Sequence, residues 1–488
     1  MVVTQKRDAI DGERRDRNRT EFRERRLGSE ERRADRRVGK CAVHRQQHTF
    51  AATALHDVVV HDRNSNGVAS ALVVYPQDGT SRAAQAETGA TATAVYSLPV
   101  GDPGRHVVFF DAYPHMYAGT ARSVQQIAQR LPEHGYTASV LLPGEGTVAD
   151  HVRDAGVDVA IVPVPDSLSH YGRTTRGLVL LRGLLALPLY WWRLRRHLRA
   201  HPGVVYVTSH RSVVLAAPAA RLAGLPVLWL ISGIEDDVAV SALSNLLATR
   251  TIACSPAASA ALPGLRPGLR PALRRRGRAR HTIVPFPLDP RFEDAPQTNP
   301  RHPPVVVTVG RLEPIKEHPL LLDAFASVRD RVPGARLRIV GGEQEGHADY
   351  AAEVHRKAAE LGDAAELTGW TDNPEALLLD ASVYVCSSRR EGMGIAIIEA
   401  MACGLPAVMT ADTGLSGFLV HEQSALIVPN GDPRALADAI VRLLDDPALA
   451  QRIADGGRAA LRQFSLDRVA AATAAVVDEM LEHAPART

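Results

Sequence analysis

The chain has 488 residues, of which 45% are hydrophobic and 23% are charged, and its formal net charge is +3. This length favours two or more domains over one large core, and so small a net charge gives no global signal for nucleic-acid binding. The four cysteines are scattered without metal-ligand spacing, which favours a reducing, cytoplasmic setting. No apolar run of about 18 residues and no signal-peptide core occur, so we expect no membrane span.

Residues 1–104 differ in composition from the rest of the chain. Residues 5–40 are dense in Arg, Asp and Glu and contain few aliphatic residues. Such a segment cannot bury enough apolar surface to offset the entropy lost on ordering. We therefore expect residues 1–104 to form a disordered extension. An Arg-rich arm for nucleic acid is the alternative, and the interleaved acids disfavour it.

A regular α/β pattern begins at Arg105. Apolar runs at 106–110, 138–143 and 157–163 are typical of buried parallel strands, and helical segments separate them. This β-α-β-α-β order predicts a doubly wound sheet, with further strands at 204–208, 226–231 and 281–285. After the first strand, Gly119 would let the backbone approach a ligand at a helix N-terminus, where free N–H groups favour anions.

Residues 177–200 are the most lipid-like part of the chain. Leucine-rich segments lead through Pro188 to Trp191 and Trp192, and a run of arginines follows. Apolar residues, tryptophans and a cationic end are typical of an interfacial helix on anionic lipid, so residues 178–199 are a candidate for peripheral membrane contact. The alternative is a core helix whose C-terminal dipole is complemented by cations.

A second alternating set begins at Pro304. Strands are expected at 305–309, 336–340, 365–370 and 382–386, with helices at 320–331 and 349–361. Ligands of open α/β sheets bind beyond the carboxyl ends of the strands. Arg311, Lys316, Gly369 and Glu391 all follow such ends, so we expect them to converge in one cleft.

Two carboxylates, Glu391 and Glu399, stand eight positions apart around the glycine-rich turn 392–394. Between Met393 and Met409 the only charged or strongly polar side chain is Glu399. A buried carboxylate without partners is costly, so Glu399 requires a partner or a ligand. Complementing the helix dipole, a gain of about 0.3–1 kcal/mol, is the alternative explanation.

These residue types suit a nucleotide diphosphate that carries a polyol. An Arg and a Lys in one loop fit a phosphate pair, and carboxylates accept hydrogen bonds from vicinal hydroxyls. The backbone N–H groups of residues 392–394, which open a helix, can hold a further anion or hydroxyl. No Walker-type loop and no complete dinucleotide fingerprint occur, which argues against a kinase or a dehydrogenase.

Residues 305–465 closely resemble the nucleotide-binding half of retaining glycosyltransferases of family 4, which have the GT-B architecture of two facing Rossmann-like domains. The resemblance rests on Gly310-Arg311 with Lys316, on Glu391-x(7)-Glu399, and on the segments 402–408 and 428–433. Residues 105–290 resemble the acceptor half more loosely. The resemblance implies an α/β fold with an acceptor domain at 105–300, a nucleotide-sugar domain at 301–465, and a closing segment at 466–488 that returns to the first domain.

The resemblance also implies roles for individual residues. Arg311 and Lys316 would hold the donor diphosphate, Glu391 would face the donor sugar, and Glu399 would bind the ribose hydroxyls. Further donor contacts would come from Gly119, Gly310, Gly369, Trp370, Gly392, Met393 and Gly394. Trp370 stands where the family places the nucleobase, although a packed core tryptophan is an equal alternative.

The chain departs from the family pattern on the acceptor side. Many members have a histidine in the segment that corresponds to residues 230–233, and this chain has none. The family's Gly-Gly-x-Pro-Glu reads Gly-Leu-Ser-Gly-Phe at 414–418. These changes leave the acceptor and sugar contacts open, whereas the residues expected at the diphosphate are present.

The function expected from the sequence is retaining transfer of a sugar from a nucleotide-diphosphate sugar to a hydroxyl acceptor, with a lipid-linked acceptor as one option. No cofactor or metal is implied beyond this donor, and no nucleic-acid partner is expected. The expected location is cytoplasmic, with or without peripheral membrane contact. Two alternatives stay open: a GT-B protein that binds the donor without turnover, and a GT-B epimerase or phosphorylase.

Overall fold

A computed structural model describes residues 105–165, 178–233, 238–260, 281–297, 302–371 and 373–482 of the chain. For residues 178–184 and 238–240 it describes the backbone alone. The expected disordered extension, residues 1–104, lies outside these ranges. Within them, each strand that the sequence predicted is present, and three further strands, at 250–253, 407–410 and 426–428, were not predicted.

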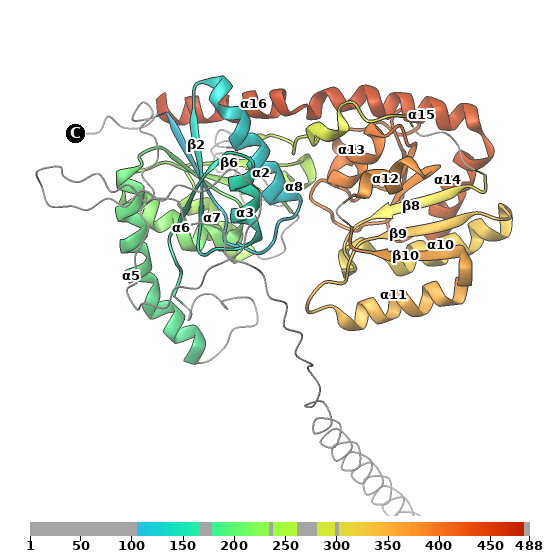
Figure 1. Ribbon diagram of the computed structural model, residues 1–488, viewed down its shortest axis with the longest axis horizontal. Helices are drawn as coiled ribbons and strands as arrows, with labels where there is room; N and C mark the ends of the chain where they lie inside the picture. The colour runs from blue at the N-terminus through green and yellow to red at the C-terminus, as the bar shows by residue number, and fades with distance from the viewer. Residues whose placement is uncertain are drawn as a thin grey trace, which may run out of the picture. The chain divides into compact units, whose positions relative to one another are not determined.

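The first domain is built on a seven-stranded sheet with the order β3-β2-β1-β4-β5-β6-β7, in which all neighbours are parallel. The five inner strands are short apolar runs that are buried along most of their length, which shows that both faces of the sheet are covered there, whereas the two edge strands are more exposed. The strands are β1 (His106–Phe110), β2 (Thr137–Leu142), β3 (Asp158–Ile161), β4 (Val204–Val207), β5 (Val227–Ile231), β6 (Arg250–Ala253) and β7 (His281–Ile283). The helices between them are α2 (Gly119–Arg130), α3 (Thr147–Asp154), α5 (Leu178–Ala200), α6 (His210–Leu222), α7 (Val238–Leu247) and α8 (Pro256–Ala260), with short 3-10 turns at η1 (Leu131–His134) and η3 (Pro290–Phe292) (Figure 1).

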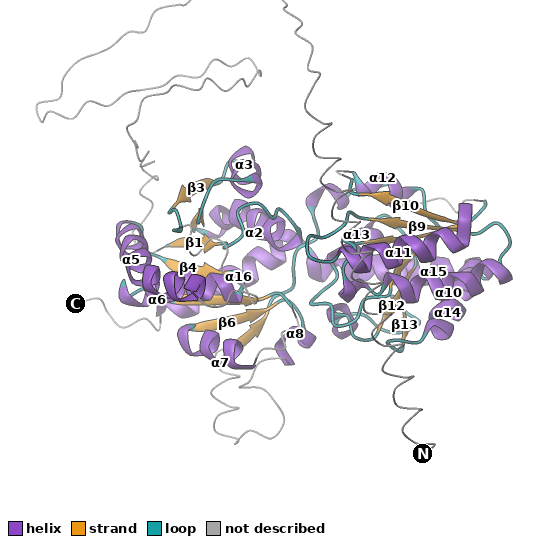
Figure 2. Cartoon of the chain, turned by 90° about the horizontal axis from the view of Figure 1, so that it is seen from below, coloured by secondary structure: helices purple, strands orange, loops and turns teal. Residues whose placement is uncertain are grey.

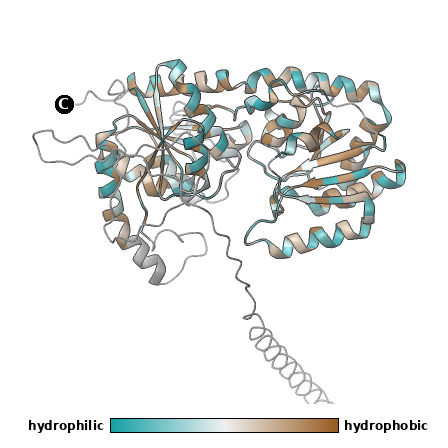
Figure 3. Ribbon diagram, viewed as in Figure 1, coloured by the Kyte–Doolittle hydropathy of each residue, from teal (hydrophilic) through white to brown (hydrophobic). Residues whose placement is uncertain are grey.

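The second domain has a six-stranded parallel sheet with the order β10-β9-β8-β11-β12-β13. Its strands are β8 (Val305–Val309), β9 (Arg336–Val340), β10 (Ala365–Gly369), β11 (Val383–Cys386), β12 (Ala407–Thr410) and β13 (Leu426–Val428). Helices flank the strands in each domain (Figure 2). The helices of the second domain are α10 (His318–Arg331), α11 (Ala348–Leu361), α12 (Pro374–Leu379), α13 (Ile395–Ala402), α14 (Pro433–Asp445) and α15 (Pro447–Ala460). Short 3-10 turns occur at η4 (Pro314–Lys316), η5 (Gly362–Ala364), η6 (Gly414–Gly417) and η7 (Leu461–Phe464). Hydropathy follows this layering, with apolar strands inside and helices that alternate between polar and apolar residues outside (Figure 3).

Both sheets have the strand order of a doubly wound fold, in which the chain reverses direction across the sheet at one switch point. In the first sheet that point lies between β1 and β4, and in the second it lies between β8 and β11. Loops leave the two central strands in opposite directions there, which opens a crevice at the carboxyl ends. The loops after β8 and β11 are therefore a candidate ligand site.

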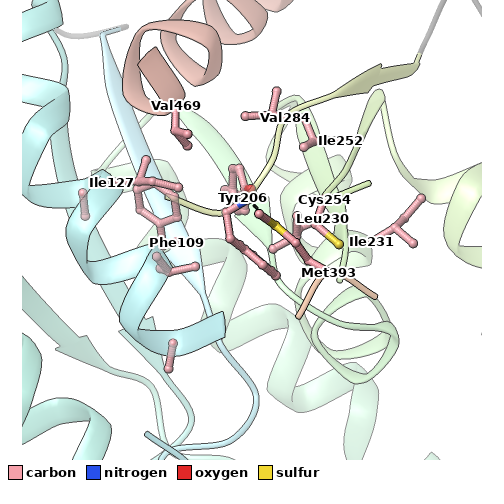
Figure 4. Packing of buried hydrophobic residues seen from close by; sticks show 14 of the residues in the cluster. Phe109, Ile127, Tyr206, Leu230, Ile231, Ile252, Cys254, Val284, Met393 and Val469 are labelled. Atoms are coloured by element: carbon pink, nitrogen blue, oxygen red, sulfur yellow. Dashed lines mark hydrogen bonds between the residues drawn. The ribbon is translucent and has the colours of Figure 1, made fainter. Parts of the chain in front are cut away.

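The C-terminal helix α16 (Leu466–Glu482) packs against α2 and η1 of the first domain. Val469 of this helix lies in the same cluster as Phe109 and Tyr206 (Figure 4), and Tyr136 donates a hydrogen bond to Asp478. The helix is therefore part of the first domain's core. No helix in the described ranges combines the length and the apolar character needed to cross a bilayer.

Candidate active site

Lys316 and Glu391 meet at the switch point of the second sheet. Lys316 ends the turn η4 after β8, and Glu391 follows β11, the neighbouring strand. Lys316 Nζ donates a hydrogen bond to Glu391 Oε1 at 2.5 Å, and the two side chains are only 18% and 17% exposed. The sequence placed both residues at strand ends, and the fold brings them into direct contact.

The backbone around this ion pair is held in an unusual conformation. Glu317, which follows Lys316, has φ 51°, and Arg390, which precedes Glu391, has φ 61°. Non-glycine residues rarely adopt this left-handed region, and in the described residues Glu422 is the one further example. Ser387 Oγ donates to the Lys316 carbonyl oxygen at 2.7 Å, and the Arg389 N–H donates to the Ile315 carbonyl at 2.8 Å. The two loops thus fix each other, and strain of this kind is concentrated at functional sites.

Both members of the pair are held in their charged forms. Burial alone would raise the pKa of Glu391, but the charge and hydrogen bond of Lys316 outweigh it and the pKa is lowered. Burial alone would lower the pKa of Lys316, but Glu391 reverses the effect and the pKa is raised. The site therefore presents a cation and an anion side by side at neutral pH.

A small cavity, partly open to solvent, lies beside the ion pair. The additional polar side chains that line it are Thr308, Tyr384, Cys386 and Ser388. Cys386 Sγ lies 3.3 Å from Ser388 Oγ and 3.8 Å from Glu391 Oε2. Burial, followed by the charge of Glu391, raises the pKa of this thiol to about 11, so it is not a reactive thiolate.

His318 is a neighbour of the pair that the sequence analysis missed. It is buried at the start of α10, and its backbone N–H donates to Tyr350 Oη at 2.8 Å. Burial and then the charge of Lys316 lower the pKa of His318 to about 4, so the imidazole is neutral at physiological pH. Its position directly after the Lys316 loop is the sequence signal that could have identified it.

Arg311 lies on the same loop as Lys316 but directs its guanidinium elsewhere. It donates to Gln344 Oε1 at 2.8 Å and to Glu313 Oε1 at 3.1 Å. Gln344 follows β9, so Arg311 links the loops after β8 and β9. Its side chain is 42% exposed, which leaves the guanidinium accessible to an anion.

Backbone hydrogen bonds gather the loops after β8, β9 and β10 at one edge of the sheet. The Gly310 N–H donates to the Val340 carbonyl at 2.8 Å, and the Gly341 N–H donates to the Gly369 carbonyl at 2.9 Å. A Cβ atom at Gly341 would lie 2.0 Å from the Gly310 carbonyl oxygen, so glycine is required for this approach. Gly310 and Gly369 therefore lie at the same edge of the sheet as Lys316, the edge formed by the carboxyl ends of the strands.

Trp370, directly after β10, is 70% exposed. This exposure excludes the alternative of a packed core tryptophan. The indole is available at the strand-end edge, where a planar ring can stack on a base.

The glycine turn before α13 packs closely against the first domain. A Cβ atom at Gly392 would lie 2.0 Å from the Ser232 carbonyl oxygen, and Ser255 Oγ donates to the Gly392 carbonyl at 2.5 Å. Met393 is 2% exposed, and its sulfur accepts a hydrogen bond from the Phe286 N–H at 3.0 Å (Figure 4). Only the backbone of Met393, and not its side chain, is therefore available to contact a ligand. Gly394 caps α13 with φ 88°, a conformation that favours glycine.

Glu399 has a partner that the sequence did not identify. Arg122 of α2 donates to Glu399 Oε1 at 2.9 Å and also lies 3.4 Å from Asp289 Oδ2. Burial raises the pKa of Glu399, and the charge of Arg122 opposes that effect only in part. The pair explains how a 5% exposed carboxylate is tolerated in an apolar helix.

The start of α2 adjoins the start of α13. A Cβ atom at Gly119 would lie 2.8 Å from Ile395 Cδ1, so glycine permits this approach. The structure therefore brings Gly119 to the helix that carries Glu399, and not into contact with the Lys316–Glu391 pair.

Asp111 occupies the switch point of the first sheet, at the carboxyl end of β1. It is 6% exposed, and the Tyr113 N–H donates to its Oδ1 at 3.0 Å. Burial raises the pKa of Asp111 to about 6 against the opposing hydrogen bonds of Tyr113 and Thr208. Among the residues that the structure describes, no group of three or more His, Cys, Asp or Glu side chains could hold a metal ion.

Two family models match the chain in tandem. A model described as "Glycosyl transferase 4-like domain" matches residues 118–288, and one described as "Glycosyl transferases group 1" matches residues 290–460. Each match covers most of one sheet and its helices.

Curated relatives match part of the chain. The D-inositol 3-phosphate glycosyltransferase of Streptomyces bingchenggensis is 33% identical over 180 residues, which are 35% of this chain and 40% of the relative. The lipopolysaccharide core biosynthesis glycosyltransferase LpsE of Rhizobium meliloti is 32% identical over 173 residues, 35% of this chain and 48% of the relative. The chain thus matches less than half the length of these relatives.

Solved structures match across both domains. HepE of Anabaena in complex with UDP has a TM-score of 0.63 at 21% identity and covers 77% of this chain and 100% of its own. Sucrose-phosphate synthase of Thermosynechococcus elongatus has a TM-score of 0.61 at 18% identity and covers 78% and 99%. At such identities the likeness confirms the expected GT-B fold.

Proposed function

Because the chain belongs to the group 1 glycosyl transferases and has the GT-B fold, we propose that it moves a sugar from a nucleotide-diphosphate sugar to a hydroxyl acceptor, with retention of configuration. The observation that carries this proposal is the largely enclosed Lys316–Glu391 pair at the switch point of the second sheet, with Lys316 Nζ 2.5 Å from Glu391 Oε1. A cation beside an anion suits a donor whose diphosphate is negative and whose sugar bears hydroxyl donors.

The charges around the pair support a division of labour. Lys316 and the accessible guanidinium of Arg311 neutralise the diphosphate as its bond to the sugar carbon breaks. The acceptor oxygen bonds to that carbon, and its hydroxyl proton passes to the leaving diphosphate. Glu391 accepts hydrogen bonds from sugar hydroxyls and stabilises the positive charge that develops on the ring. The pair is already oriented by its own hydrogen bond, so little reorganisation accompanies the reaction.

In this proposal the nucleoside lies at the edge of the sheet beyond β10. Trp370 stacks on the base, with Gly310 and Gly369 allowing close approach of the ligand to the backbone. Glu399 accepts from the ribose hydroxyls and shares its carboxylate with Arg122, which reaches only Oε1. Gly392, Met393 and Gly394 contribute backbone groups at the start of α13, and Gly119 brings the first domain to that helix.

Uridine nucleotides are the first donors to test, because HepE was solved with UDP and with UDP-glucose. Donors that bind the folded state raise its melting temperature, so a panel of UDP-, GDP- and ADP-sugars identifies the donor by thermal shift. We expect one nucleotide class to raise the melting temperature and the others to leave it unchanged.

Product analysis with that donor separates the candidate reactions. A transferase gives nucleoside diphosphate and a glycosylated acceptor, an epimerase gives an isomeric sugar nucleotide without acceptor, and a phosphorylase requires inorganic phosphate. A thermal shift without any turnover would show a binding protein and refute the proposed transfer.

The acceptor proposed is a lipid-linked hydroxyl at the cytoplasmic face of a membrane. The support for it is the solvent-facing side of α5, which carries both exposed apolar and cationic side chains. An assay with purified components that compares a lipid-linked with a water-soluble acceptor of the same sugar tests this preference for a lipid-linked acceptor.

A further inference from the structure

The helix α5 has two distinct faces. Its described side chains, residues 185–200, include four that are almost fully buried: Leu187, Tyr190, Leu194 and Leu198. The exposed positions are 185, 188, 189, 192, 193, 196, 199 and 200. At about 100° per residue these positions fall within an arc of roughly 140° on the opposite side. We call this exposed arc the outer face of α5, and the helix runs along the outside of its domain (Figure 1).

The outer face is apolar in its first half and cationic in its second half. Leu185, Leu189 and Trp192 are 72%, 52% and 56% exposed, at the spacing i, i+4, i+7. Arginines 193, 196 and 199 follow on the same face, all exposed, and the 23-residue helix contains no acidic residue. The apolar and cationic halves together extend over about 21 Å of helix.

The two adjacent tryptophans have different environments. Trp191 is partly buried, and its Nε1–H donates to the Val214 carbonyl at 3.2 Å, so it anchors α5 to α6. Trp192 alone faces solvent. A core role therefore accounts for Trp191, but it leaves the exposure of Trp192 and the two leucines unexplained.

We propose that the outer face of α5 docks on an anionic lipid surface. Leucine and tryptophan insert at the headgroup boundary, and arginines in the same plane pair with lipid phosphates. Cations at a helix C-terminus also complement its dipole, but that effect does not require three large apolar side chains in solvent.

A second copy of the chain is a poorer occupant of this face. The exposed apolar area is roughly 400 Å², about half of what a stable interface buries on each partner. Two outer faces packed together would also bury arginines without an acid on either helix. An anionic membrane supplies both the apolar phase and the counter-charge.

This inference deepens the proposed function, because docking would bring the cleft to a lipid-linked acceptor, and its biological meaning rests on that function. The docking itself is measured without turnover. Failure of docking leaves donor binding intact, so the two proposals fail separately.

The test is co-sedimentation of the full-length protein with vesicles of phosphatidylcholine alone or mixed equally with phosphatidylglycerol. We expect the wild type to sediment with the anionic vesicles and to remain in the supernatant with the neutral ones. The double variant Leu189→Glu/Trp192→Glu should lose anionic binding by at least about tenfold. The matched control is Leu246→Glu on α7, a leucine that is 75% exposed away from α5, and it should bind as the wild type does.

A second variant changes charge without touching the apolar residues. Arg193→Gln and Arg196→Gln alter exposed side chains only, and each should weaken anionic binding about fivefold. The donor-induced thermal shift should stay unchanged in every α5 variant, which shows that the site remains folded.

The proposal is overturned by any of three results. The wild type could fail to sediment with anionic vesicles, the control could lose binding as strongly as the double variant, or the arginine variants could bind as the wild type does. A fourth result would come from light scattering. If the wild type does not bind vesicles but forms a dimer that Leu189→Glu dissociates, the outer face of α5 is an interface between two copies of the chain.

Discussion

Removing one member of the Lys316–Glu391 pair should lower the free energy of unfolding by much more than removing both members. Lys316→Met leaves the Glu391 carboxylate in a largely enclosed site without its cation. The double variant Lys316→Met/Glu391→Gln leaves no charge to desolvate. The four proteins, including Glu391→Gln alone, form a double-mutant cycle that isolates the coupling between the two side chains.

The structure sets the expected size of that coupling. Breaking a fully buried ion pair by removing one partner costs about 3–5 kcal/mol. Because the two side chains are 18% and 17% exposed, solvent relieves part of the penalty, and we expect about 2–4 kcal/mol for Lys316→Met. The double variant should recover to within about 1 kcal/mol of the wild type.

The pH dependence of the coupling follows from the two pKa shifts. The pKa of Glu391 is lowered from 4.5, so its contribution is complete above that value and is lost as pH falls through the folded pKa. The pKa of Lys316 is raised from 10.5, so its contribution is complete below that value and is lost as pH rises through the folded pKa. The coupling should therefore be constant between about pH 5 and pH 10 and should fall outside this window.

Urea unfolding followed by far-UV circular dichroism measures the four free energies between pH 3 and pH 9. A coupling below about 0.5 kcal/mol at pH 7 would refute the reasoning, because independent sites are additive to within that value. A coupling that persists unchanged at pH 3 would refute its electrostatic origin.

Three further predictions concern other residues of the two domains. Trp370→Ala should weaken binding of the donor's nucleoside diphosphate about tenfold or more without changing the melting temperature, since base stacking contributes roughly 1–3 kcal/mol; unchanged affinity in calorimetry would place the base elsewhere. Asp111→Asn should gain stability relative to the wild type as pH rises from 4 to 7, by up to about 3 kcal/mol, because the raised pKa of Asp111 makes ionisation oppose folding above its unfolded value of 3.8; a pH-independent difference in urea unfolding would contradict it. Arg122→Ala should destabilise by about 1–3 kcal/mol by leaving Glu399 unpaired, and Glu399→Gln in the same chain should restore most of the loss; strictly additive losses would show that the pair is not coupled.

The parallel strands were predictable because their signal is local. Runs such as 106–110 and 305–309 are short, apolar and bounded by turn residues, and each became a strand that is mostly buried. The alternation of strands and helices then limits the topology to a doubly wound sheet, whose strand ends locate Lys316 and Glu391.

Contacts between distant segments were not predictable from the same signals. The isolation of Glu399 in an apolar helix required a partner, but nothing in the periodicity of α2 identified Arg122, 277 positions away. The turn at Met393 suggested a ligand contact, whereas tertiary packing buried the side chain against Phe286. The sequence also offered no reason to distinguish Trp191 from Trp192. The structure distinguishes them, because the orientation of α5 turns Trp191 toward α6 and Trp192 toward solvent.

Release of nucleoside diphosphate from the donor that binds is the measurement closest to the central claim. The wild type should turn this donor over with a suitable acceptor, and Glu391→Gln should lose at least about a hundredfold in rate, the typical cost of removing one transition-state contact. The variant should keep the donor-induced thermal shift, which shows a folded, binding-competent site. Turnover by Glu391→Gln at the wild-type rate would contradict the role assigned to the Lys316–Glu391 pair.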